Sequence, residues 1–367
     1  MTAVEPSYKA SPISEKVTPT MSLCELLRST SWKKFPRMAG NTDVKIKMDY
    51  AYDYYSLSKL DEDPVDLFEK TCGFFDEVQR MMESENFDQA RAAAYEEYTI
   101  ATMAAMIFGS NMIEKAGSTE DITMKLCKSI FAGFTVSPEI PSNHSDYIAT
   151  RAQLLHQNLH VSHESITRSR LEIIQHAEAW TYLLRSLLSS PLTESHLLTA
   201  HRILCTSLDL DDHTPYAGLY RLVPVHAGLT AFPPPSSVPH FMRTLVYDYN
   251  LAIQRARVAG YLDPFALAAE FAHRFVNIHP FVDGNGRVCR MIMNAILFCY
   301  SGVVVPVGER EDGREAYLGV VVRASERESG GNEEEGGKKA WAELSSLIVL
   351  EACGRFRRLR DRLRTVA

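Results

Sequence analysis

The residues best suited to chemistry lie together in one polar stretch, which runs from Ile278 to Arg290 and reads IHPFVDGNGRVCR. Apolar residues recur at helical spacing on both sides, among them Phe271 and Phe275 before it and Ile292 and Ile296 after it. Asp-Gly and Asn-Gly pairs are also typical of hairpin turns. Because both flanks have a helical period, the sequence predicts two helices joined by a polar loop.

The composition of this loop indicates a binding site for an anion. Gly284 and Gly286 permit positive φ angles and allow backbone N–H groups to approach a ligand closely. The loop leads into the start of a helix, where free N–H donors and the helix dipole favour negative charge. Arg287 and Arg290 are three residues apart, so both guanidinium groups can reach the same side of the first helical turn. Together these features predict a cradle for a polyphosphate.

Two further side chains in the loop are suited to complete a catalytic site. Phosphates would repel the Asp283 carboxylate unless a divalent cation lay between them, so this residue predicts Mg²⁺ as a cofactor. His279 is the side chain here whose ordinary pKa suits a general base near neutral pH. A lone histidine before proline is more often structural, and Asp283 alone could cap a helix. The prediction therefore rests on the combination of these residues within twelve positions.

The same stretch resembles the signature HxFx(D/E)GNGRxxR of Fic (Fido) domain proteins and matches it at every position. The resemblance covers roughly residues 161–330. It implies an all-α fold, a helical bundle of the Fic type with a short β-hairpin flap. Further segments resemble the helix, the strand with its flap, and the Arg-x-x-Tyr segment of that family: residues 197–204, residues 217–221 with Val225 and residues 232–234, and Arg314 with Tyr317.

The resemblance implies a protein adenylyltransferase, which transfers AMP from ATP to a Ser, Thr or Tyr hydroxyl group of a target protein and releases pyrophosphate. His279 would deprotonate that hydroxyl group, Asp283 would hold Mg²⁺ against the phosphates, and the Asn285 side chain would steady the α-phosphate. The flap would bind an extended segment of the target by strand-like pairing. The implied phosphate-binding and nucleotide-binding residues are Gly284, Asn285, Gly286, Arg287, Arg290 and Tyr317, and the implied flap residues are Val225, Ala227 and Phe232.

An earlier segment resembles the inhibitory motif (S/T)xxxE(G/N) that is frequent in the family. Ser110 and Glu114 match this motif, and Lys115 departs from it at the sixth position. A carboxylate paired with Arg290 would occupy the place of the γ-phosphate and force ATP into an unproductive pose. The sequence therefore predicts that Glu114 inhibits the enzyme, and Lys115 leaves the strength of that inhibition open. The alternative is that Glu114 is simply a solvated residue near a helix end.

Helical periodicity dominates the segments that must position these residues, and β-forming residues at 220–228 predict the flap. We divide the chain into a flexible tail at 1–45, a helical region at 46–160 with the inhibitory motif at 110–115, the Fic domain at 161–330, and a last part at 331–367. That last part should hold a low-complexity loop, a helix and a solvated basic tail. Helices are predicted over residues 63–78, 87–106, 163–188, 193–208, 238–260, 264–278, 287–300 and 340–353.

Charge and composition exclude some classes of partner and indicate where the protein works. A net charge of −7 argues against a protein that binds nucleic acid by broad phosphate neutralisation. The seven cysteines are an odd number without CxxC spacing, which indicates reduced thiols. The first residues do not resemble a signal peptide, and no stretch reaches the ~20 apolar residues that a membrane span needs. We expect a cytoplasmic or nuclear protein that acts on a protein hydroxyl group, with no nucleic-acid or membrane partner; helices 63–106 leave a homo-oligomer open.

Three other functions are compatible with these residues. The same pocket could remove AMP from a modified protein by hydrolysis if Glu114 positions a water molecule. Related enzymes transfer other phosphate-containing groups, although the glycine-rich loop favours AMP. A nucleotide-gated binding protein is the third alternative, and the complete catalytic motif argues against it.

Overall fold

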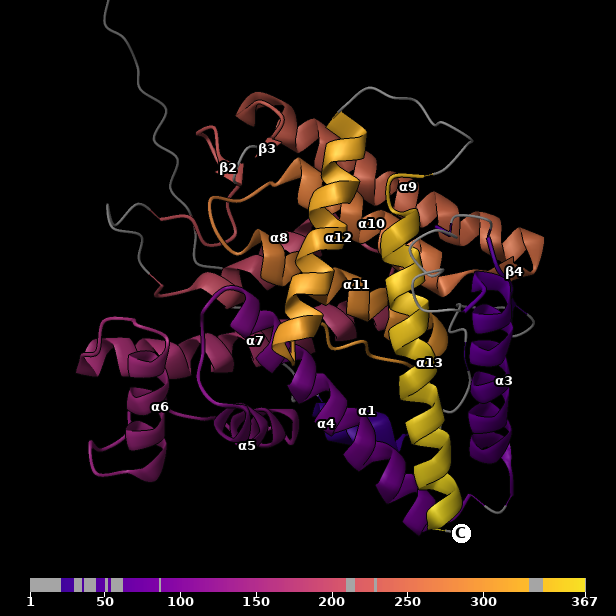
Figure 1. Ribbon diagram of the computed structural model, residues 1–367, viewed down its shortest axis with the longest axis horizontal. Helices are drawn as coiled ribbons and strands as arrows, with labels where there is room; N and C mark the ends of the chain where they lie inside the picture. The colour runs from indigo at the N-terminus through magenta and orange to yellow at the C-terminus, as the bar shows by residue number, and fades with distance from the viewer. Residues whose placement is uncertain are drawn as a thin grey trace, which may run out of the picture.

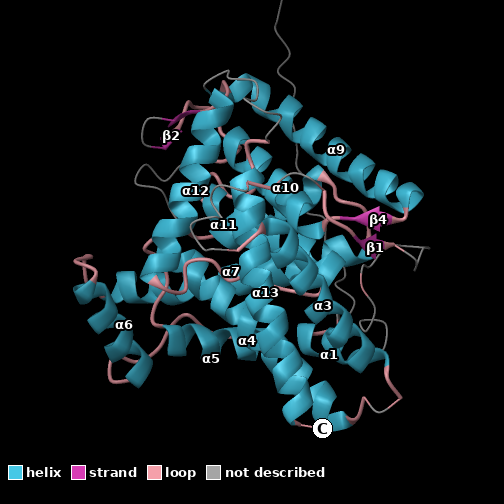
Figure 2. Cartoon of the chain, turned by 45° about the vertical axis from the view of Figure 1, so that its right-hand side comes forward, coloured by secondary structure: helices cyan, strands magenta, loops and turns pink. Residues whose placement is uncertain are grey.

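Helices form nearly all of the regular structure in the part of the chain that the computed structural model describes, namely residues 21–29, 35, 44–49, 52–53, 62–85, 87–208, 215–227, 230–329 and 339–366. The arrangement confirms the predicted all-α class with a short β-hairpin (Figure 2). The helices are α1 (Leu23–Arg28), α3 (Pro64–Glu83), α4 (Gln89–Ile113), α5 (Glu120–Phe131), α6 (Ser145–His156), α7 (His163–Ser189), α8 (Glu194–Cys205), η2 (Pro235–Ser237), α9 (Val238–Ala259), α10 (Pro264–Ile278), α11 (Asn285–Ser301), α12 (Glu311–Ser329) and α13 (Ala342–Thr365). The strands are β1 (Lys45–Ile46), β2 (His226–Ala227), β3 (Thr230–Ala231) and β4 (Tyr261–Leu262).

Helix α11 is the most deeply buried element of the fold, because almost every side chain from Asn285 to Ser301 is shielded from solvent. Helices α10 and α7 pack against it, and α13 packs against both α10 and α3 (Figure 1). The shared apolar core includes Leu23 near one end of the described chain and Leu363 near the other. The helix that starts at the polar loop is therefore fixed by segments from the whole chain.

Part of the predicted flexible tail is regular structure, so that prediction was wrong for the described residues. In α1, Ser22 and Glu25 form a reciprocal capping box, and Leu23 is buried in the core. Strand β1 pairs in parallel with β4, with Lys45 opposite Tyr261. Residues 1–20 lie outside the described residues.

The predicted basic tail belongs to α13, which continues to Thr365 and packs along α3. Its arginines at positions 357, 358, 362 and 364 are exposed, in agreement with the predicted solvated helix end. Two of its arginines also meet carboxylates: Arg364 lies 2.7 Å from Glu77 on α3, and Arg355 pairs with Glu309, in the loop before α12. The apolar positions of the same helix, such as Phe356 and Leu363, are buried. The basic residues therefore form the polar side of a packed amphipathic helix.

Two helix boundaries differ from the predicted ones in a way that matters for the site. Helix α4 continues past residue 106 to Ile113, so the inhibitory motif lies on its last turn. Helix α12 continues to Ser329, into residues 325–339, which the sequence predicts as a low-complexity loop, and residues 330–338 lie outside the described part. Among the helices of the described residues, none is both long and apolar enough to span a membrane.

Helix α10 begins at a buried carboxylate that also anchors the N-terminal segment. Asp263 Oδ1 accepts the backbone N–H groups of Phe265 and Ala266 at 3.1 and 3.0 Å and so caps the helix. Its Oδ2 accepts the N–H of Asp49 at 2.8 Å, and the Tyr52 hydroxyl donates to the carboxylate at 3.0 Å. One side chain therefore fixes the start of α10 and the segment that crosses it.

Replacing this carboxylate should destabilise the fold. Asp263→Ala should lower the free energy of unfolding by about 2–4 kcal/mol, because it removes a helix cap and leaves buried donors unpaired. Tyr52→Phe removes only one of these hydrogen bonds and should cost about 0.5–1.5 kcal/mol. Urea unfolding monitored by circular dichroism measures both values. Equal costs for the two variants would contradict the role of Asp263 as the shared anchor.

Candidate active site

The polar loop joins α10 to α11 through two residues with left-handed backbone conformation. His279 ends α10 with φ 48°, and Gly284 precedes α11 with φ 79°. A Cβ atom on Gly284 would lie 3.1 Å from Cys205 Sγ and 3.3 Å from the His201 ring. Glycine is therefore required at this position both for its backbone angle and for the close approach of α8.

The Asn285 side chain closes the loop on itself. Its Oδ1 accepts the N–H of Phe281 at 2.9 Å, and its Nδ2 donates to the carbonyl of the same residue at 2.8 Å. Asn285 is 3% exposed. Its side chain was predicted to steady a phosphate, but the structure engages it in the loop. The backbone N–H groups at the start of α11, which has no side-chain cap, remain as the donors for an anion.

His201 on α8 contacts the polar loop through the face of its ring and one of its ring nitrogens. Its ring stacks on Phe281 with centroids 3.6 Å apart. Nδ1 accepts the N–H of Gly218 at 2.8 Å, so Nε2 carries the proton and donates to the Asp283 carbonyl at 2.9 Å. Burial lowers the pKa of His201 to about 4, which keeps the ring neutral at physiological pH. Sequence reasoning assigned this residue no role.

His279 has the geometry of a general base. Its Nδ1 lies 3.1 Å from the carbonyl oxygen of Val276, and because a carbonyl only accepts, Nδ1 carries the proton. The lone pair of Nε2 is then free to accept a proton. The Phe232 ring of the flap segment stacks on the imidazole with centroids 3.9 Å apart. Burial lowers the pKa of His279, which favours the neutral, basic form.

Arg221 connects the flap segment to the polar loop, and sequence reasoning missed this role. Its side chain is 1% exposed. It donates to the carbonyl oxygens of His279 at 2.7 Å, Pro233 at 2.6 Å and Val223 at 3.2 Å. In the sequence, the only sign of this role is that Arg221 is the single arginine in the β-forming stretch 220–228. Its guanidinium group binds backbone carbonyls and fixes the base relative to the flap.

The two arginines of the motif are both buried at the start of α11, as the sequence predicts. Arg287 is 4% exposed, and its Nη2 lies 3.0 Å from Asp283 Oδ2, while its Nε and Nη1 have no protein partner. Asp283 keeps 49% of its side chain exposed. Unpaired buried donors beside a helix N-terminus fit an anion, and an exposed carboxylate at the rim fits a divalent cation shared with phosphates.

Arg290 is held by the last turn of α4. Its Nε donates to Ser110 Oγ at 2.7 Å, and its Nη2 lies 2.6 Å from Glu114 Oε1. Arg290 is 2% exposed, so this contact supplies the negative charge next to a buried guanidinium group. A Cβ atom on Gly286, in the first turn of α11, would collide with the Glu114 carboxylate, so a larger residue there would force that side chain to shift. The structure thus brings together both predicted inhibitory residues and the arginine.

Lys115 follows Glu114 in left-handed conformation, with φ 55°. The inhibitory motif has glycine or asparagine at this position, which adopt that conformation more readily. The chain reverses here and continues through Gly117, which also has a positive φ of 76°. The departure from the motif therefore leaves the turn in place and adds backbone strain to it.

The structure bears differently on the predictions for the flap and for the Arg-x-x-Tyr segment. Strands β2 and β3 pair antiparallel, with His226 opposite Ala231, so the predicted hairpin exists, while target binding by Val225, Ala227 and Phe232 stays a prediction. Tyr317 is 3% exposed in α12, beside Cys289 and Arg290. Protein covers the ring, and its contact with the nucleotide stays a prediction.

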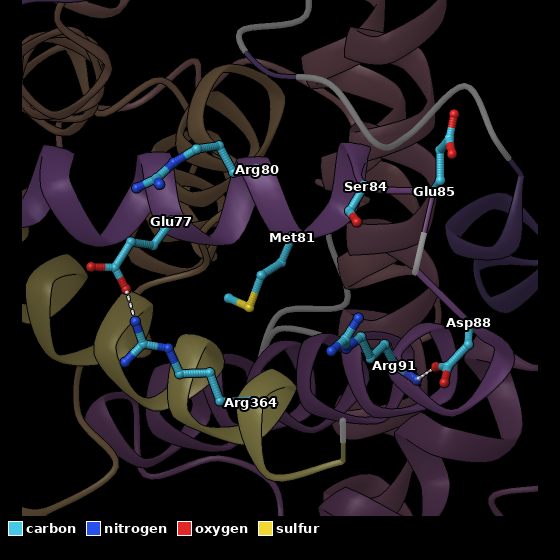
Figure 3. Close-up of a pocket in the computed structure, with 8 residues that line it drawn as sticks. All are labelled: Glu77, Arg80, Met81, Ser84, Glu85, Asp88, Arg91 and Arg364. Atoms are coloured by element: carbon cyan, nitrogen blue, oxygen red, sulfur yellow. Dashed lines mark hydrogen bonds and ion pairs between the residues drawn. The ribbon is translucent and has the colours of Figure 1, made fainter.

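A polar cleft of about 770 Å³ lies far from the motif, between α3, α4 and α13 (Figure 3). Arg91 on α4 lines it, and the 19 residues from there to Ser110 place it about 28 Å from the inhibitory turn. Its charges are balanced, with Glu77 paired to Arg364 across the cleft wall. We assign no function to it. Within the described residues no cluster of three or more His, Cys, Asp or Glu side chains could hold a metal by themselves.

The fold and the site define a helical protein with a glycine-containing loop, a partly buried histidine and two buried arginines at the start of its central helix. Residues 191–297 match the model of the Fic/DOC family, so the chain carries a Fic domain. The matched part is narrower than the domain predicted at 161–330. A crystal structure of a Fic domain containing signaling protein from Bacteroides thetaiotaomicron is similar in fold, with a TM-score of 0.57 and 18% identity over 82% of this chain and 98% of that chain.

Curated relatives align with less of the chain. A Fido domain-containing protein of Dictyostelium discoideum is 41% identical over 98 residues, which are 27% of this chain and 65% of that protein. The protein adenylyltransferase Fic of Drosophila grimshawi is 28% identical over 166 residues, 44% of this chain and 32% of that protein. A uridine 5'-monophosphate transferase of Xanthomonas campestris pv. campestris is 28% identical over 137 residues, 35% and 25% of the two chains. The chain therefore spans less than two thirds of the length of each relative.

Removing the strain at Lys115 should stabilise the protein. Lys115→Gly should raise the free energy of unfolding by about 0.5–1 kcal/mol, because glycine adopts a positive φ without a steric cost. Lys128→Gly, within the exposed side of α5, should instead lower it by roughly 0.5–1 kcal/mol. Thermal and urea unfolding measure both. A destabilised Lys115→Gly variant would contradict the strained turn.

The His279 imidazole should titrate below pH 6.5, its ordinary midpoint, because burial lowers its pKa. Phe232→Ser uncovers one face of the ring and should move the midpoint upward. Proton NMR of the Cε1–H signal, assigned by its loss in His279→Ala, measures the shift. Phe134→Ser, at a 70% exposed position on another surface, is the control. A midpoint at or above 6.5 in the unchanged protein would argue against the buried base.

Proposed function

We propose that this chain is a protein adenylyltransferase, which transfers AMP from ATP to a hydroxyl group of a target protein. The observation that carries this proposal is the position of a neutral His279, with Nε2 free, next to a helix N-terminus and two buried arginines. A base beside an anion site is the minimum that transfer of a nucleotidyl group to a hydroxyl group requires. The similarity to adenylyltransferases of the family supports the choice of AMP.

In this mechanism His279 Nε2 accepts the proton of the target hydroxyl group. The hydroxyl oxygen then forms a bond to the α-phosphorus of ATP, and the bond from that phosphorus to the oxygen bridging the α- and β-phosphates breaks. Pyrophosphate leaves, and Arg287 and Arg290 stabilise the charge that develops on it. Asp283 would hold a divalent cation, which would supply additional charge neutralisation when bound. In the product, a phosphodiester bond joins the AMP to the target protein.

Glu114 limits this reaction, because its carboxylate contacts the guanidinium group that the outermost phosphate needs. Binding of ATP in the productive pose would require Glu114 to leave Arg290. The same carboxylate, 36% exposed beside Arg290, also favours a second candidate function. It could position a water molecule that attacks the phosphorus of an AMP-modified protein and removes the AMP.

The transfer reaction can be tested with ATP labelled at different phosphates. Glu114→Gly should increase label incorporated from α-labelled ATP on the order of tenfold, which corresponds to ~1.4 kcal/mol of released inhibition. γ-Labelled ATP should give none, because that phosphate leaves with pyrophosphate. His279→Ala in the same background should abolish incorporation and retain ATP binding, measured by calorimetry.

Each other result assigns a different function. Label from γ-labelled ATP alone would mean phosphotransfer, and α-label from UTP but not ATP would mean uridylyl transfer. Loss of label from a pre-modified protein with the unchanged chain, but not with Glu114→Gly, would favour hydrolysis. No incorporation in Glu114→Gly from any nucleotide would remove the transferase proposal, and transfer by His279→Ala would remove His279 as the base.

A further inference from the structure

The turn that carries Glu114 is held by α7 as well as by Arg290. Asn111, on the last turn of α4, receives a hydrogen bond at Oδ1 from His176 Nδ1 at 2.8 Å. The backbone carbonyl of Asn111 accepts the N–H of Glu114 at 3.0 Å and that of Ala116 at 2.9 Å. The residue that binds α7 is therefore also the residue that closes the inhibitory turn.

A second contact from the same face of α7 fixes the end of this turn. Glu172 lies four residues before His176, so both side chains project from one side of the helix. Its Oε2 accepts the N–H of Gly117 at 2.8 Å, and its Oε1 receives a hydrogen bond from Arg168 at 3.3 Å. The segment from Asn111 to Gly117 is thus attached to α7 at both of its ends.

His176 is fully buried and has one defined protonation state. It is 0% exposed, and Asn111 is 1% exposed. Burial, with Arg287 and Arg290 nearby, lowers the pKa of His176 well below its usual value. Because Asn111 Oδ1 accepts, the single ring proton lies on Nδ1. Nε2 has no protein partner, and the same is true of Nε and Nη1 of Arg287.

The contact between Glu114 and Arg290 does not hold the turn by itself. Arg290 is buried and needs a negative group beside it, but Glu114 is 36% exposed, so a phosphate can replace its carboxylate without leaving a buried group of the turn unpaired. Lys115 adds a strained backbone angle directly after it. A hydrogen bond between two fully buried groups is the better candidate for the anchor, since breaking it leaves buried polar groups unpaired.

We propose that His176 is a positioning residue for the inhibitory turn, whose bond to Asn111 keeps Glu114 against Arg290. Without this bond the turn opens more often and the phosphate site becomes available. The effect on activity rests on the proposed transferase function. The position of the turn can be measured independently of that function.

The test uses two substitutions of His176 with opposite expectations. His176→Leu removes the hydrogen bond and keeps most of the buried volume, whereas His176→Asn places an amide donor close to the position of Nδ1. Each is made alone and together with Glu114→Gly. Leu183→Ala, at an equally buried position further along α7, is the control for a general loss of stability.

His176→Leu should raise AMP transfer roughly two- to tenfold, the range expected for one lost hydrogen bond. In the Glu114→Gly background it should give no further increase, because the contact that it releases is already gone. His176→Asn and Leu183→Ala should stay at the level of the unchanged chain. An unchanged rate in His176→Leu, or an equal increase in both backgrounds, would overturn the proposal.

Hydrogen exchange supplies the readout that does not depend on transfer. His176→Leu should speed exchange of the amide protons of Glu114, Ala116 and Gly117 and leave those in the middle of α11 unchanged. Unchanged protection of these three amides would overturn the proposal even if no transfer is detected in any variant. Faster exchange without any transfer in Glu114→Gly would instead keep the positioning role and reject the transferase function.

Discussion

Two buried guanidinium groups at the start of α11 set the constraint on which the site depends. Arg287 and Arg290 lie at the positive end of a helix dipole and are almost completely shielded from water. Buried charges of one sign are costly unless negative groups compensate them. Within the described residues, Asp283 and Glu114 provide that compensation. A polyphosphate would satisfy the same requirement, which is why inhibition and binding compete for one position.

The need for a negative group beside Arg290 explains why α4 ends next to the start of α11. The helix must deliver Ser110 and Glu114 to Arg290, although they are about 180 residues apart in sequence. Helix α13 packs along α3 and contacts α4, and α7 receives the last turn of α4 through Asn111 (Figure 1). Segments outside the matched Fic region therefore serve the site, because they place the carboxylate that opposes the loop.

The loop itself was predictable from the sequence, and much of its support was not. The spacing of His279, Asp283, Arg287 and Arg290 in one continuous stretch fixes their relative positions, because they lie on one loop and one helical turn. Arg221 binds carbonyl oxygens of residues far along the chain, and such partners carry no sequence signal. His201 also binds the backbone at both ring nitrogens.

Several side chains have contacts that the sequence alone does not show. The arginines of α13 look solvated in sequence, and two of them also meet carboxylates on α3 and α4 that only the packing brings near. Tyr317 matches its motif, yet the packing of α12 covers its ring. Asn285 has the right side chain for a phosphate, and the loop uses it first. Tertiary packing determines the surroundings of the arginines and of Tyr317, whereas the contact of Asn285 is local, with a residue four positions earlier.

The most direct measurement of the central claim is the affinity for ATP, ADP and AMP, determined by calorimetry for the unchanged chain and for Glu114→Gln. The account predicts that removing the carboxylate charge strengthens ATP binding most and AMP binding least, because only the outer phosphates reach Arg290. Equal gains for all three nucleotides, or no gain for ATP, would contradict the claim that Glu114 occupies the place of a phosphate.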